Sequence, residues 1–545
     1  MNASILWCTC GNTGIVRRKP HNLRALFAWI ASAAVVVASG VGCGGAENSK
    51  KVGSGSSSGL GGSNSGSILT GSSGGGSGGG TSSSGGTTAV QCNDAGQCSC
   101  SGNNTTTITG YVYDPGNSHP LYNVSVYVAD PSSPLPNLDS VPLTCGCSEI
   151  YPATVLATGS PTDATGYFEI PCAPSGAVTL VVQTGKWRMS YPGVTIQANQ
   201  VNKVPNMRLP ANSTEGSLPN IAISTGGADS LECLPLRIGV SASEYVLGSA
   251  TGGHIHIYSG YNGAGTAQGS VESYQALWDK QADLNEHDLV LLSCEGQETT
   301  GGSPGVALNS TYQTYLQNYA NAGGRVFASH FHYAWFNTGP FDTGSDKLAT
   351  WTTGAQTIDD SKSFPADIDT TLASGAAFPE GAALEQWLGV VGAFTANKLP
   401  IWFARDNVKA LVQPPSTEWI HLDSSSSQAP SAAQYFSVDT PIGGTDVCGR
   451  VVYSDLHVSG GPGTNEPGVA ADYPSAAGAG GGRGGFGGGG GGGRGGNAKL
   501  VAPAQCATHP LTPQEEALEF MLFDLSSCLV PVGQSAAPTG PTVVR

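Results

Sequence analysis

Residues 288–294 read Asp-Leu-Val-Leu-Leu-Ser-Cys, a continuous apolar run that begins with a charged residue and ends with a cysteine. Such a run is typical of a central strand in a parallel sheet, because that strand is buried on both faces. Between residues 310 and 322, tyrosine and leucine recur at i, i+3, i+4 and i+7, which predicts an amphipathic helix. Gly323-Gly324 ends the helix, and residues 325–330, Arg-Val-Phe-Ala-Ser-His, begin the next strand.

The same alternation extends in both directions along the chain. A helix is expected from Ala228, and Thr512-Pro513 with Glu515 forms a capping box that opens a final helix. Strands that alternate with helices predict a flavodoxin-like, doubly wound α/β domain over residues 218–530. Its further strands are expected at residues 221–225, 254–258, 434–438 and 449–454.

A smaller all-β domain is expected before it, over residues 104–212. Apolar runs with a period near two, such as Val-Ser-Val-Tyr-Val at 124–128, alternate there with Pro, Gly, Asn and Asp. The fold class is therefore multidomain: a small β-sandwich, then the α/β domain, with Gly/Ser-rich segments expected to be disordered.

Composition excludes one class of partner and separates the folded parts from the rest. The 545 residues include 79 glycines and carry a formal net charge of −16, so nucleic acid is not an expected partner. Much of the glycine lies in a Gly/Ser-rich stretch within residues 44–103 and in a run at 474–497. We interpret the first as a flexible tether, the second as a disordered loop insertion in the α/β domain, and residues 531–545 as a flexible tail.

The N-terminus reads as an export signal that spans residues 1–43. A basic segment that includes Arg17-Arg18 precedes an uncharged stretch from Ala25 to Gly42. The sequence Ser-Gly-Val-Gly-Cys at 39–43 resembles a bacterial lipoprotein signal, which implies a lipid on Cys43 and a membrane as partner. An uncleaved membrane anchor and simple secretion are the alternatives. The expected location is the cell envelope, as an outer-membrane or cell-surface lipoprotein.

Eleven cysteines follow Cys43, and disulfides are their expected use outside the cytoplasm. Because the number is odd, at least one thiol stays unpaired in a monomer. Cys506 and Cys528 bracket the final helix, and we expect them to pair with each other or with Cys448.

The β-rich segment resembles the carboxypeptidase regulatory-like, transthyretin-like sandwich. The resemblance rests on Gly-Tyr-Val-Tyr-Asp at 110–114, Pro-Leu-Tyr-Asn-Val at 120–124, and the turn and strand at 162–170. It implies a spacer or a carbohydrate-binding module. Trp187 is a candidate to stack on a sugar ring, and the alternative is a core tryptophan.

The α/β segment resembles the ThuA-like branch of the class I glutamine amidotransferase-like fold. The resemblance rests on the strand after 286–288, on residues 323–330 and on Gly-Arg-Val-Val-Tyr-Ser-Asp-Leu-His at 449–457, while residues 340–430 look like insertions. Active amidotransferases carry a nucleophilic cysteine at the strand-to-helix elbow. The matching residues here are Ser-His-Phe-His at 329–332, so glutaminase activity is not expected.

Open α/β sheets bind ligands at the carboxyl ends of their strands. His-x-His on an extended segment points both rings to one face, so His330 and His332 with His457 are candidate ligands of a divalent metal. Alternatively, Glu295 and His330 form an acid–base pair, or Cys294 acts as a nucleophile. The structural alternative is that the histidines cap backbone groups and that Cys294 is a buried apolar residue or half of a disulfide. Ligand contacts are also expected from Thr225, Asp229 and Asp455.

Two hypotheses about function follow. The first is an exported, lipid-anchored envelope protein of binding or structural type, with glycans or other envelope proteins as partners. The alternative is an extracytoplasmic hydrolase that uses the His-rich site. His254 and His256 repeat the His-x-His spacing inside an expected strand, and we interpret them as solvent-facing.

Overall fold

The computed structural model describes residues 90–92, 98–100, 104–260, 272–298, 308–444, 446–459, 466–472, 503, 506–533 and 543. All of them lie in the compact unit that spans Ser83–Arg545. The expected export signal with Cys43, most of the expected tether and the glycine-rich run at 474–497 lie outside the described residues. Within the described part of the chain, no helix is long and apolar enough to cross a membrane.

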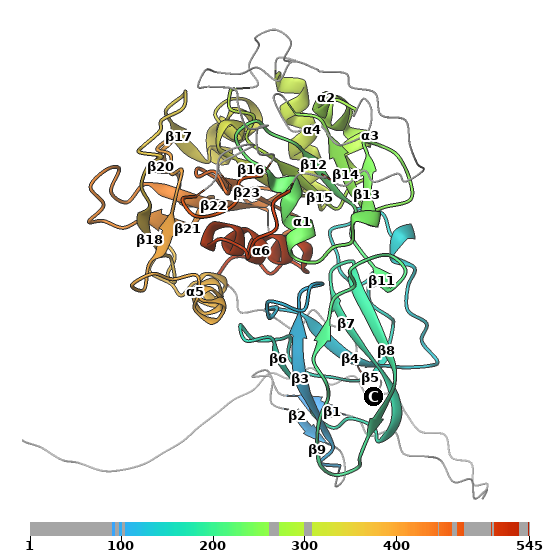
Figure 1. Ribbon diagram of the computed structural model, residues 1–545. Helices are drawn as coiled ribbons and strands as arrows, with labels where there is room; N and C mark the ends of the chain where they lie inside the picture. Colours follow the sequence, from blue (N-terminus) through green and yellow to red (C-terminus); the bar gives the residue numbers. More distant parts are fainter. Residues whose placement is uncertain are drawn as a thin grey trace, which may run out of the picture. The chain divides into compact units, whose positions relative to one another are not determined.

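A ten-stranded sheet forms the centre of the mixed α/β part of the structure (Figure 1). Its strand order is β13-β14-β12-β15-β16-β23-β22-β21-β18-β19. The strands from β13 to β23 run parallel to one another, and those from β22 to β19 continue the sheet with antiparallel pairing. The strands are β12 (Ile221–Ser224), β13 (Tyr245–Leu247), β14 (Ile255–Tyr258), β15 (Leu289–Leu292), β16 (Arg325–Ser329), β18 (Phe364–Ile368), β19 (Leu399–Ile401), β21 (Thr417–Leu422), β22 (Ala433–Thr440) and β23 (Gly449–Ser454).

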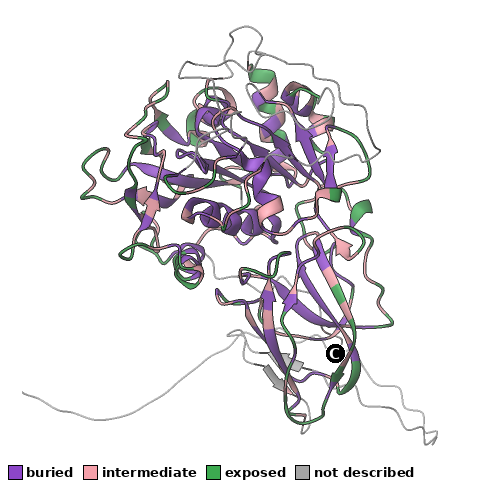
Figure 2. Cartoon of the chain, in the orientation of Figure 1, coloured by how far each residue is buried: buried purple, intermediate pink, exposed green. Residues whose placement is uncertain are grey.

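The two faces of the parallel half bury two different cores, as the two-residue repeat of a strand requires. Leu289 and Leu291 of β15 belong to one core, whereas Val290 and Leu292 belong to the other. Helix α6 (Pro513–Ser526) packs in the first core and helix α4 (Ser310–Asn321) in the second, and the strands between them are buried (Figure 2). The apolar run at 288–294 is thus a central parallel strand, as predicted.

The amphipathic helix predicted at 310–322 is α4, and the capping box of Thr512 and Glu515 opens α6. The helix predicted from Ala228 is wrong. The backbone of Gly226 and Ala228 packs against the end of β15, where the Ala228 N–H donates to the Cys294 carbonyl at 2.9 Å. Only a single 3₁₀ turn and a one-turn helix follow. The remaining helices are α1 (Leu234–Arg237), α2 (Tyr274–Trp278), α3 (Gln281–Leu284) and α5 (Pro379–Val391), with 3₁₀ turns η1 (Leu138–Ser140), η2 (Leu231–Cys233), η3 (Ala242–Glu244), η4 (His330–Trp335), η5 (Gly339–Asp342) and η6 (Gly344–Asp346).

Residues 340–430, expected as insertions, contribute ordered structure to the sheet. Strands β18, β19 and β21 come from this segment and extend the sheet beyond β22. Two more strands, β17 (Ala349–Trp351) and β20 (Val408–Leu411), pair as a separate two-stranded sheet. The extension matters for the site below because it brings residues 352–360 and 405–408 toward the ends of the parallel strands.

The segment before the α/β part is all-β, in agreement with the two-residue period of its sequence. One sheet has the order β10-β3-β6 with β9 also paired to β3, and the other has the order β11-β8-β7-β4-β5 (Figure 1). A third, two-stranded sheet pairs β1 with β2. The strands are β1 (Val90–Cys92), β2 (Cys98–Cys100), β3 (Thr107–Tyr113), β4 (Ser125–Ala129), β5 (Val155–Thr158), β6 (Tyr167–Ile170), β7 (Gly176–Thr184), β8 (Trp187–Ile196), β9 (Val201–Lys203), β10 (Met207–Arg208) and β11 (Gly216–Ser217).

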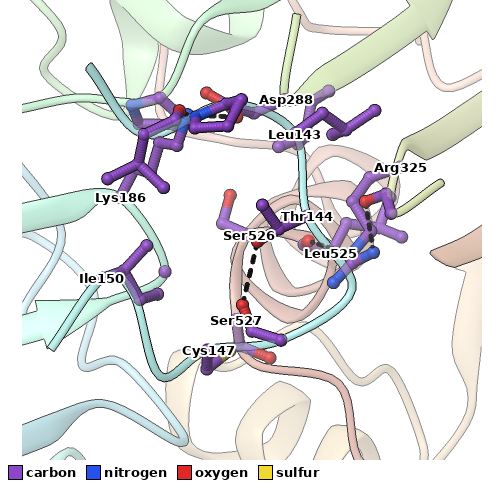
Figure 3. Close-up of a pocket in the computed structure, with 17 residues that line it drawn as sticks. Leu143, Thr144, Cys147, Ile150, Lys186, Asp288, Arg325, Leu525, Ser526 and Ser527 are labelled. Carbon is purple, nitrogen blue, oxygen red and sulfur yellow. Dashed lines mark hydrogen bonds and ion pairs between the residues drawn. The ribbon is translucent and has the colours of Figure 1, made fainter. Parts of the chain in front are cut away.

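The all-β segment and the α/β part pack closely against each other. The Trp187 indole N–H donates to Ser526 Oγ at 3.3 Å, and the Trp387 indole N–H donates to the Pro120 carbonyl at 2.6 Å. Figure 3 shows a cavity at this junction, beside the ion pair of Lys186 and Asp288. Its volume is about 70 Å³, which is far below the several hundred Å³ of a typical ligand pocket.

Four disulfides join distant parts of the described chain. They are Cys100–Cys172, Cys145–Cys448, Cys147–Cys528 and Cys233–Cys506. The pairing expected for Cys506 and Cys528 is wrong, because the 14 residues of α6 separate them. A helix of that length spans about 21 Å, well beyond the reach of a disulfide.

Removal of the Cys147–Cys528 bridge is expected to destabilise the fold strongly. Because the adjacent Cys145–Cys448 bridge remains, Cys147–Cys528 closes an effective loop of about 82 residues, so its loss in the Cys147→Ser, Cys528→Ser double variant raises the entropy of the unfolded chain, at a cost of about 4 kcal/mol. Urea unfolding followed by tryptophan fluorescence measures the change. The Cys100→Ser, Cys172→Ser variant is the matched control, and its loop of 72 residues predicts a loss of similar size. Equal unfolding midpoints for the wild type and the first variant would contradict the expectation.

Candidate functional site

The chain turns sharply where β16 ends. His330 follows Ser329 with a φ of 36°, in the left-handed region that non-glycine residues rarely adopt, and the 3₁₀ turn η4 begins there. The Tyr453 hydroxyl of β23 donates to the His330 carbonyl at 2.8 Å and holds the turn in place. The prediction that His330 and His332 share one face of an extended segment is therefore wrong.

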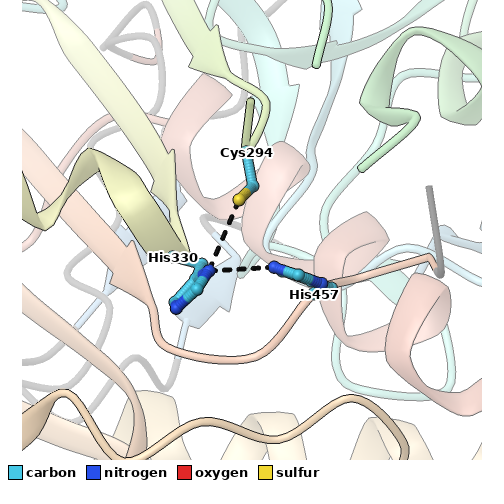
Figure 4. Close-up of side chains that lie close together, drawn as sticks. All are labelled: Cys294, His330 and His457. Carbon is cyan, nitrogen blue, oxygen red and sulfur yellow. Dashed lines mark hydrogen bonds between the residues drawn. The ribbon is translucent and has the colours of Figure 1, made fainter. Parts of the chain in front are cut away.

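Three side chains converge at the carboxyl ends of three adjacent parallel strands (Figure 4). Cys294 follows β15, His330 follows β16, and His457 follows β23. The Cys294 sulfur lies 3.4 Å from His330 Nδ1, and His457 Nε2 lies 2.9 Å from the same nitrogen. Cys294 and His330 are fully buried, and His457 is 6 % exposed. Cys294 has no disulfide partner.

Hydrogen bonds determine the tautomer of His330. Its Nε2 faces two acceptors at 3.1 Å, the Asn407 side-chain oxygen and the Ala355 carbonyl. The Asn407 amide nitrogen donates to the carbonyls of Thr352 and Gly354 at 2.7 and 2.8 Å, which orients its oxygen toward His330. His330 therefore carries its proton on Nε2 and directs the Nδ1 lone pair at Cys294 and His457.

The tautomer of His457 follows from its other neighbour. Arg405 Nη2 lies 3.4 Å from His457 Nδ1 and can only donate, so His457 accepts at Nδ1 and carries its proton on Nε2. That proton points to His330 Nδ1. Asp360 accepts from the Arg405 guanidinium at 2.6 and 3.3 Å and balances its charge. The result is a directed chain of hydrogen bonds from Arg405 through both histidines to Asn407.

The cluster is electrically neutral at neutral pH. Burial, and then the Arg405 charge, lowers the pKa of His330 to about 3 and lowers the pKa of His457 well below its usual range. Burial raises the pKa of the Cys294 thiol to about 12, although backbone hydrogen bonds from Phe331 and Gly296 oppose the shift. The sequence-based hypothesis has Cys294 as a nucleophile with His330 as its base, and these surroundings favour the neutral thiol and the neutral ring over a preformed thiolate beside a charged histidine.

His332 does not take part in the cluster, contrary to the prediction that it is a metal ligand. Its Nε2 donates to the Ser293 carbonyl at 2.9 Å, and its Nδ1 accepts from the Trp335 indole N–H at 3.2 Å. Both ring nitrogens are therefore used. The three-membered group of metal-binding side chains at this position contains Cys294 in its place.

The carboxylates of Asp229 and Asp455 are hydrogen-bonded to neighbouring protein groups and are therefore not free to contact a ligand. Asp229 accepts from the Ser329 hydroxyl at 2.7 Å and from the Val458 N–H at 3.0 Å. Asp455 accepts from the Asn407 N–H at 2.8 Å, and its other oxygen lies 2.8 Å from the Tyr453 hydroxyl, whose single proton is shared with the His330 carbonyl. Burial raises the pKa of each carboxyl to about 6. Both side chains are fully buried, and their hydrogen bonds position the backbone segments that carry the cluster residues.

The other predicted residues lie outside the cluster. Thr225 is buried, and its hydroxyl accepts from the Gly260 N–H at 3.3 Å. Glu295 is also buried, with its carboxylate beside Gly260, where an added Cβ would lie 3.3 Å from Oε1. Trp187 is fully buried, with its ring 5.8 Å from that of Phe523, so it offers no face to a sugar.

The solvent-facing interpretation of His254 and His256 is wrong. His256 lies in β14 and is buried, and His254, directly before this strand, is half-buried. His254 Nδ1 lies 2.7 Å from the Glu244 carboxylate, and His256 Nδ1 donates to the Gly248 carbonyl at 2.8 Å. His256 also packs edge-on against His287, with 4.8 Å between ring centroids.

Sequence reasoning missed Asn407, Arg405 and Tyr453. The first two lie within residues 340–430, where no motif or periodicity marks them. Tyr453 falls in the predicted strand at 449–454, and its register opposite Ala328 is the signal that could have placed it beside the elbow.

No family model and no curated protein matches the chain. Solved structures give low structural similarity. Two are interface mutants of a type II cohesin–X-dockerin complex from Acetivibrio cellulolyticus. The first match covers 22% of this chain and 76% of the solved chain, at 14% identity and a TM-score of 0.13. The second match covers 28% of this chain and 88% of the solved chain, at 13% identity and a TM-score of 0.15. A cytoplasmic protein from Salmonella typhimurium matches 45% of this chain and 91% of its own at 11% identity and a TM-score of 0.24. At these TM-scores the likenesses carry no argument about the site.

The buried neutral histidines are expected to make an acid-labile contribution to stability. Burial lowers the pKa of His287 and His330 to about 3 and that of His332 to about 4, so these rings bind protons only in the unfolded state between about pH 6.5 and 4. The contribution of His330 to the free energy of unfolding therefore falls by about 3 kcal/mol as pH drops from 6.5 to 4. Buried carboxyls with raised pKa values act in the opposite direction, so the effect of one histidine is read from a comparison of variants; they are Asp114, Asp229, Glu380, Glu418, Asp455, Glu466 and Glu516.

Urea titrations of the wild type and of His330→Gln at several pH values measure the effect. The variant lacks one buried neutral ring, so its unfolding free energy relative to that of the wild type is expected to rise as pH drops from 6.5 to 4, by about 3 kcal/mol. Identical pH dependence in the two proteins would show that His330 is not buried in its neutral form. The His421→Gln variant serves as control, since that half-exposed ring pairs with Asp369.

Proposed function

We propose that this chain is an exported, lipid-anchored protein of the bacterial cell envelope that acts by binding a carbohydrate rather than by catalysis. The export signal, Cys43 and the Gly/Ser-rich segment after it support the anchor. The four described disulfides suit an oxidising compartment. Partners are then the membrane, through the lipid, and envelope glycans.

The strand order supports the finer fold assignments in this proposal. With the three-residue edge strand β13 left out, the parallel strands β14-β12-β15-β16-β23, numbered along the chain, have the order 2-1-3-4-5 of the flavodoxin-like folds. A ThuA-like, amidotransferase-like α/β domain fits this order and the sharp turn at His330. The two facing sheets of the all-β segment fit a carboxypeptidase regulatory-like module.

The observation that carries the binding proposal is a large cavity with a mixed polar and apolar lining on the antiparallel half of the sheet. It measures about 800 Å³, within the range of ligand pockets. Its wall consists of Asp369, residues 371–374, residues 413–418 and Val532, and its polar side chains are hydroxyls, an amide and carboxylates. Such groups hydrogen-bond to the hydroxyls of a sugar. Gln413 and Glu418 also line a neighbouring cavity of about 310 Å³, which extends the surface for a chain-like glycan.

The electrostatics of the cavity give its carboxylates separate roles. His421 Nδ1 lies 3.0 Å from the Asp369 carboxylate, and that carboxylate raises the pKa of His421. Burial, and then the nearby Asp369 charge, raises the pKa of Glu418 to about 7. Near neutral pH, Glu418 can therefore both donate and accept a hydrogen bond, as a hydroxyl-rich ligand requires.

A second candidate function is an extracytoplasmic hydrolase, favoured by the convergence of Cys294, His330 and His457 at the strand ends. The purified protein would then cleave model glycosides or esters, and His330→Ala would abolish the activity. Activity that is absent from the wild type, or equal in the variant, removes this candidate.

The anchor predicts lipid attachment to one cysteine. Metabolic labelling with a fatty-acid probe is expected to mark the wild type and to leave Cys43→Ser unlabelled, because the thiol is the acylation site. The Cys8→Ser, Cys10→Ser variant is the control and keeps its label, since both residues lie in the removed segment. Labelling of Cys43→Ser at the wild-type level would refute the lipid-site assignment.

The cavity predicts where a glycan binds. On a glycan array the wild type is expected to bind at least one polysaccharide, and Glu418→Ala and Asp369→Ala are expected to weaken that binding by about tenfold or more, because each removes a side chain that hydrogen-bonds to the ligand. The exposed Glu385→Ala on α5 is the control. An array without binding, or unchanged affinity in both cavity variants, would contradict the proposal.

A further inference from the structure

We infer that Cys294, His330 and His457 form a three-ligand site for one thiophilic divalent ion, with Zn²⁺ as the preferred occupant. This inference goes beyond the proposed function, because it depends on neither the lipid anchor nor the glycan cavity. One sulfur and two imidazole nitrogens lie within 4.8 Å of one another, each from the end of a neighbouring strand. Thiolate and imidazole are the ligands that zinc prefers.

The spacing of the donor atoms is close to that of a tetrahedral site. With Zn–N bonds of about 2.05 Å and a Zn–S bond of about 2.3 Å, tetrahedral ligands stand about 3.3 Å apart for two nitrogens and about 3.6 Å for sulfur and nitrogen. The corresponding separations here are 2.9 Å and 3.4 Å. These two pairs of donor atoms need to separate by only a few tenths of an ångström to admit an ion, and the third pair lies within 4.8 Å.

His330 already has the outer hydrogen bonds of a metal ligand. A metal-bound histidine usually donates its other ring N–H to a carbonyl or carboxylate, which fixes the ring and its tautomer. His330 donates Nε2–H to the Asn407 side-chain oxygen and the Ala355 carbonyl, so the Nδ1 lone pair faces the cluster without any rearrangement (Figure 4).

Binding changes two proton positions. The Cys294 S–H bond breaks as the Zn–S bond forms, and that proton leaves to solvent. The His457 proton moves from Nε2 to Nδ1, with no net gain or loss, and the ring tilts away from Arg405, whose contact at 3.4 Å is long. The Arg405 guanidinium stays ion-paired with the Asp360 carboxylate. The process therefore releases one proton for each ion bound.

Three protein ligands leave the fourth position to an exogenous molecule. Among the described residues, the group of metal-binding side chains at this position has three members. Structural zinc sites are closed by four protein ligands, whereas three ligands and an open position are typical of sites that bind water or substrate. An occupied site would therefore place a bound water at the carboxyl ends of the parallel strands.

Metal titration of the full-length protein in detergent tests the inference. After treatment with a chelator, the wild type is expected to bind one equivalent of Zn²⁺ and to release one proton, measured by calorimetry in buffers of different ionisation enthalpy. With Co²⁺ it is expected to show a sulfur-to-cobalt charge-transfer band. Cys294→Ser loses this band, and both Cys294→Ser and His330→Gln weaken Zn²⁺ binding by about 100-fold or more, beyond the loss caused by an outer-shell change.

His421→Gln is the matched control, because His421 belongs to the separate group with Asp369 and Glu418. If His421→Gln still binds one equivalent of Zn²⁺, the ion is assigned to the Cys294 cluster. If His421→Gln no longer binds Zn²⁺, the inference is overturned. If the two cluster variants fail to fold, X-ray absorption of the zinc-loaded wild type decides: one sulfur and two imidazole neighbours support the site. An all-oxygen shell, or no saturable binding, overturns it. Lipid labelling and glycan binding use other residues, so failure of the proposed function is observed separately.

Discussion

The Asp229 carboxylate is the constraint on which the arrangement at the strand ends depends. One of its oxygens accepts from the Ser329 hydroxyl and the Val458 N–H, and the other accepts from the N–H and hydroxyl of Ser459. Ser329 immediately precedes His330, and Val458 immediately follows His457. A single buried group thus sets the separation of two chain segments, and with it the contact of the two histidine rings. The four hydrogen bonds offset part of the cost of removing the carboxylate from water, and the rest of that cost raises the pKa of Asp229 to about 6.

The same logic explains how the sharp turn at His330 persists. A non-glycine residue with positive φ costs on the order of 1–3 kcal/mol and survives only where its surroundings over-determine it. Here Tyr453 holds the carbonyl of His330, Asn407 holds its ring, and Asp455 holds both Tyr453 and Asn407. The strain is therefore carried by buried hydrogen bonds from β23 and from the segment after β19. The cluster is preorganised, with few alternative conformations open to its side chains.

Much of the fold could be predicted from sequence because it depends on local pattern. The apolar run at 288–294, the helix at 310–322 and the capping box at Thr512 each follow from nearest-neighbour chemistry. The site could be predicted only in part. The strand ends were the right place for Cys294, His330 and His457, but the exclusion of His332 depends on the turn at Ser329, which converts an extended segment to a 3₁₀ turn. Arg405 and Asn407 reach the site through tertiary packing of a segment without periodicity.

Two disulfides connect the all-β segment to the elements that position His457, although the all-β segment does not contact the cluster. Cys145 and Cys147, with one residue between them, bond to Cys448, just before β23, and to Cys528, just after α6, respectively. Arg325 adds hydrogen bonds to the carbonyls of Cys448 and Leu525 at the same end of the sheet. The amino end of β23 is therefore fastened covalently, and the carboxyl end of this strand leads to Asp455 and His457. Because a paired strand shifts as a unit in its register, fixing one end restricts the other. The all-β segment thus helps to hold His457 in place from the opposite edge of the sheet.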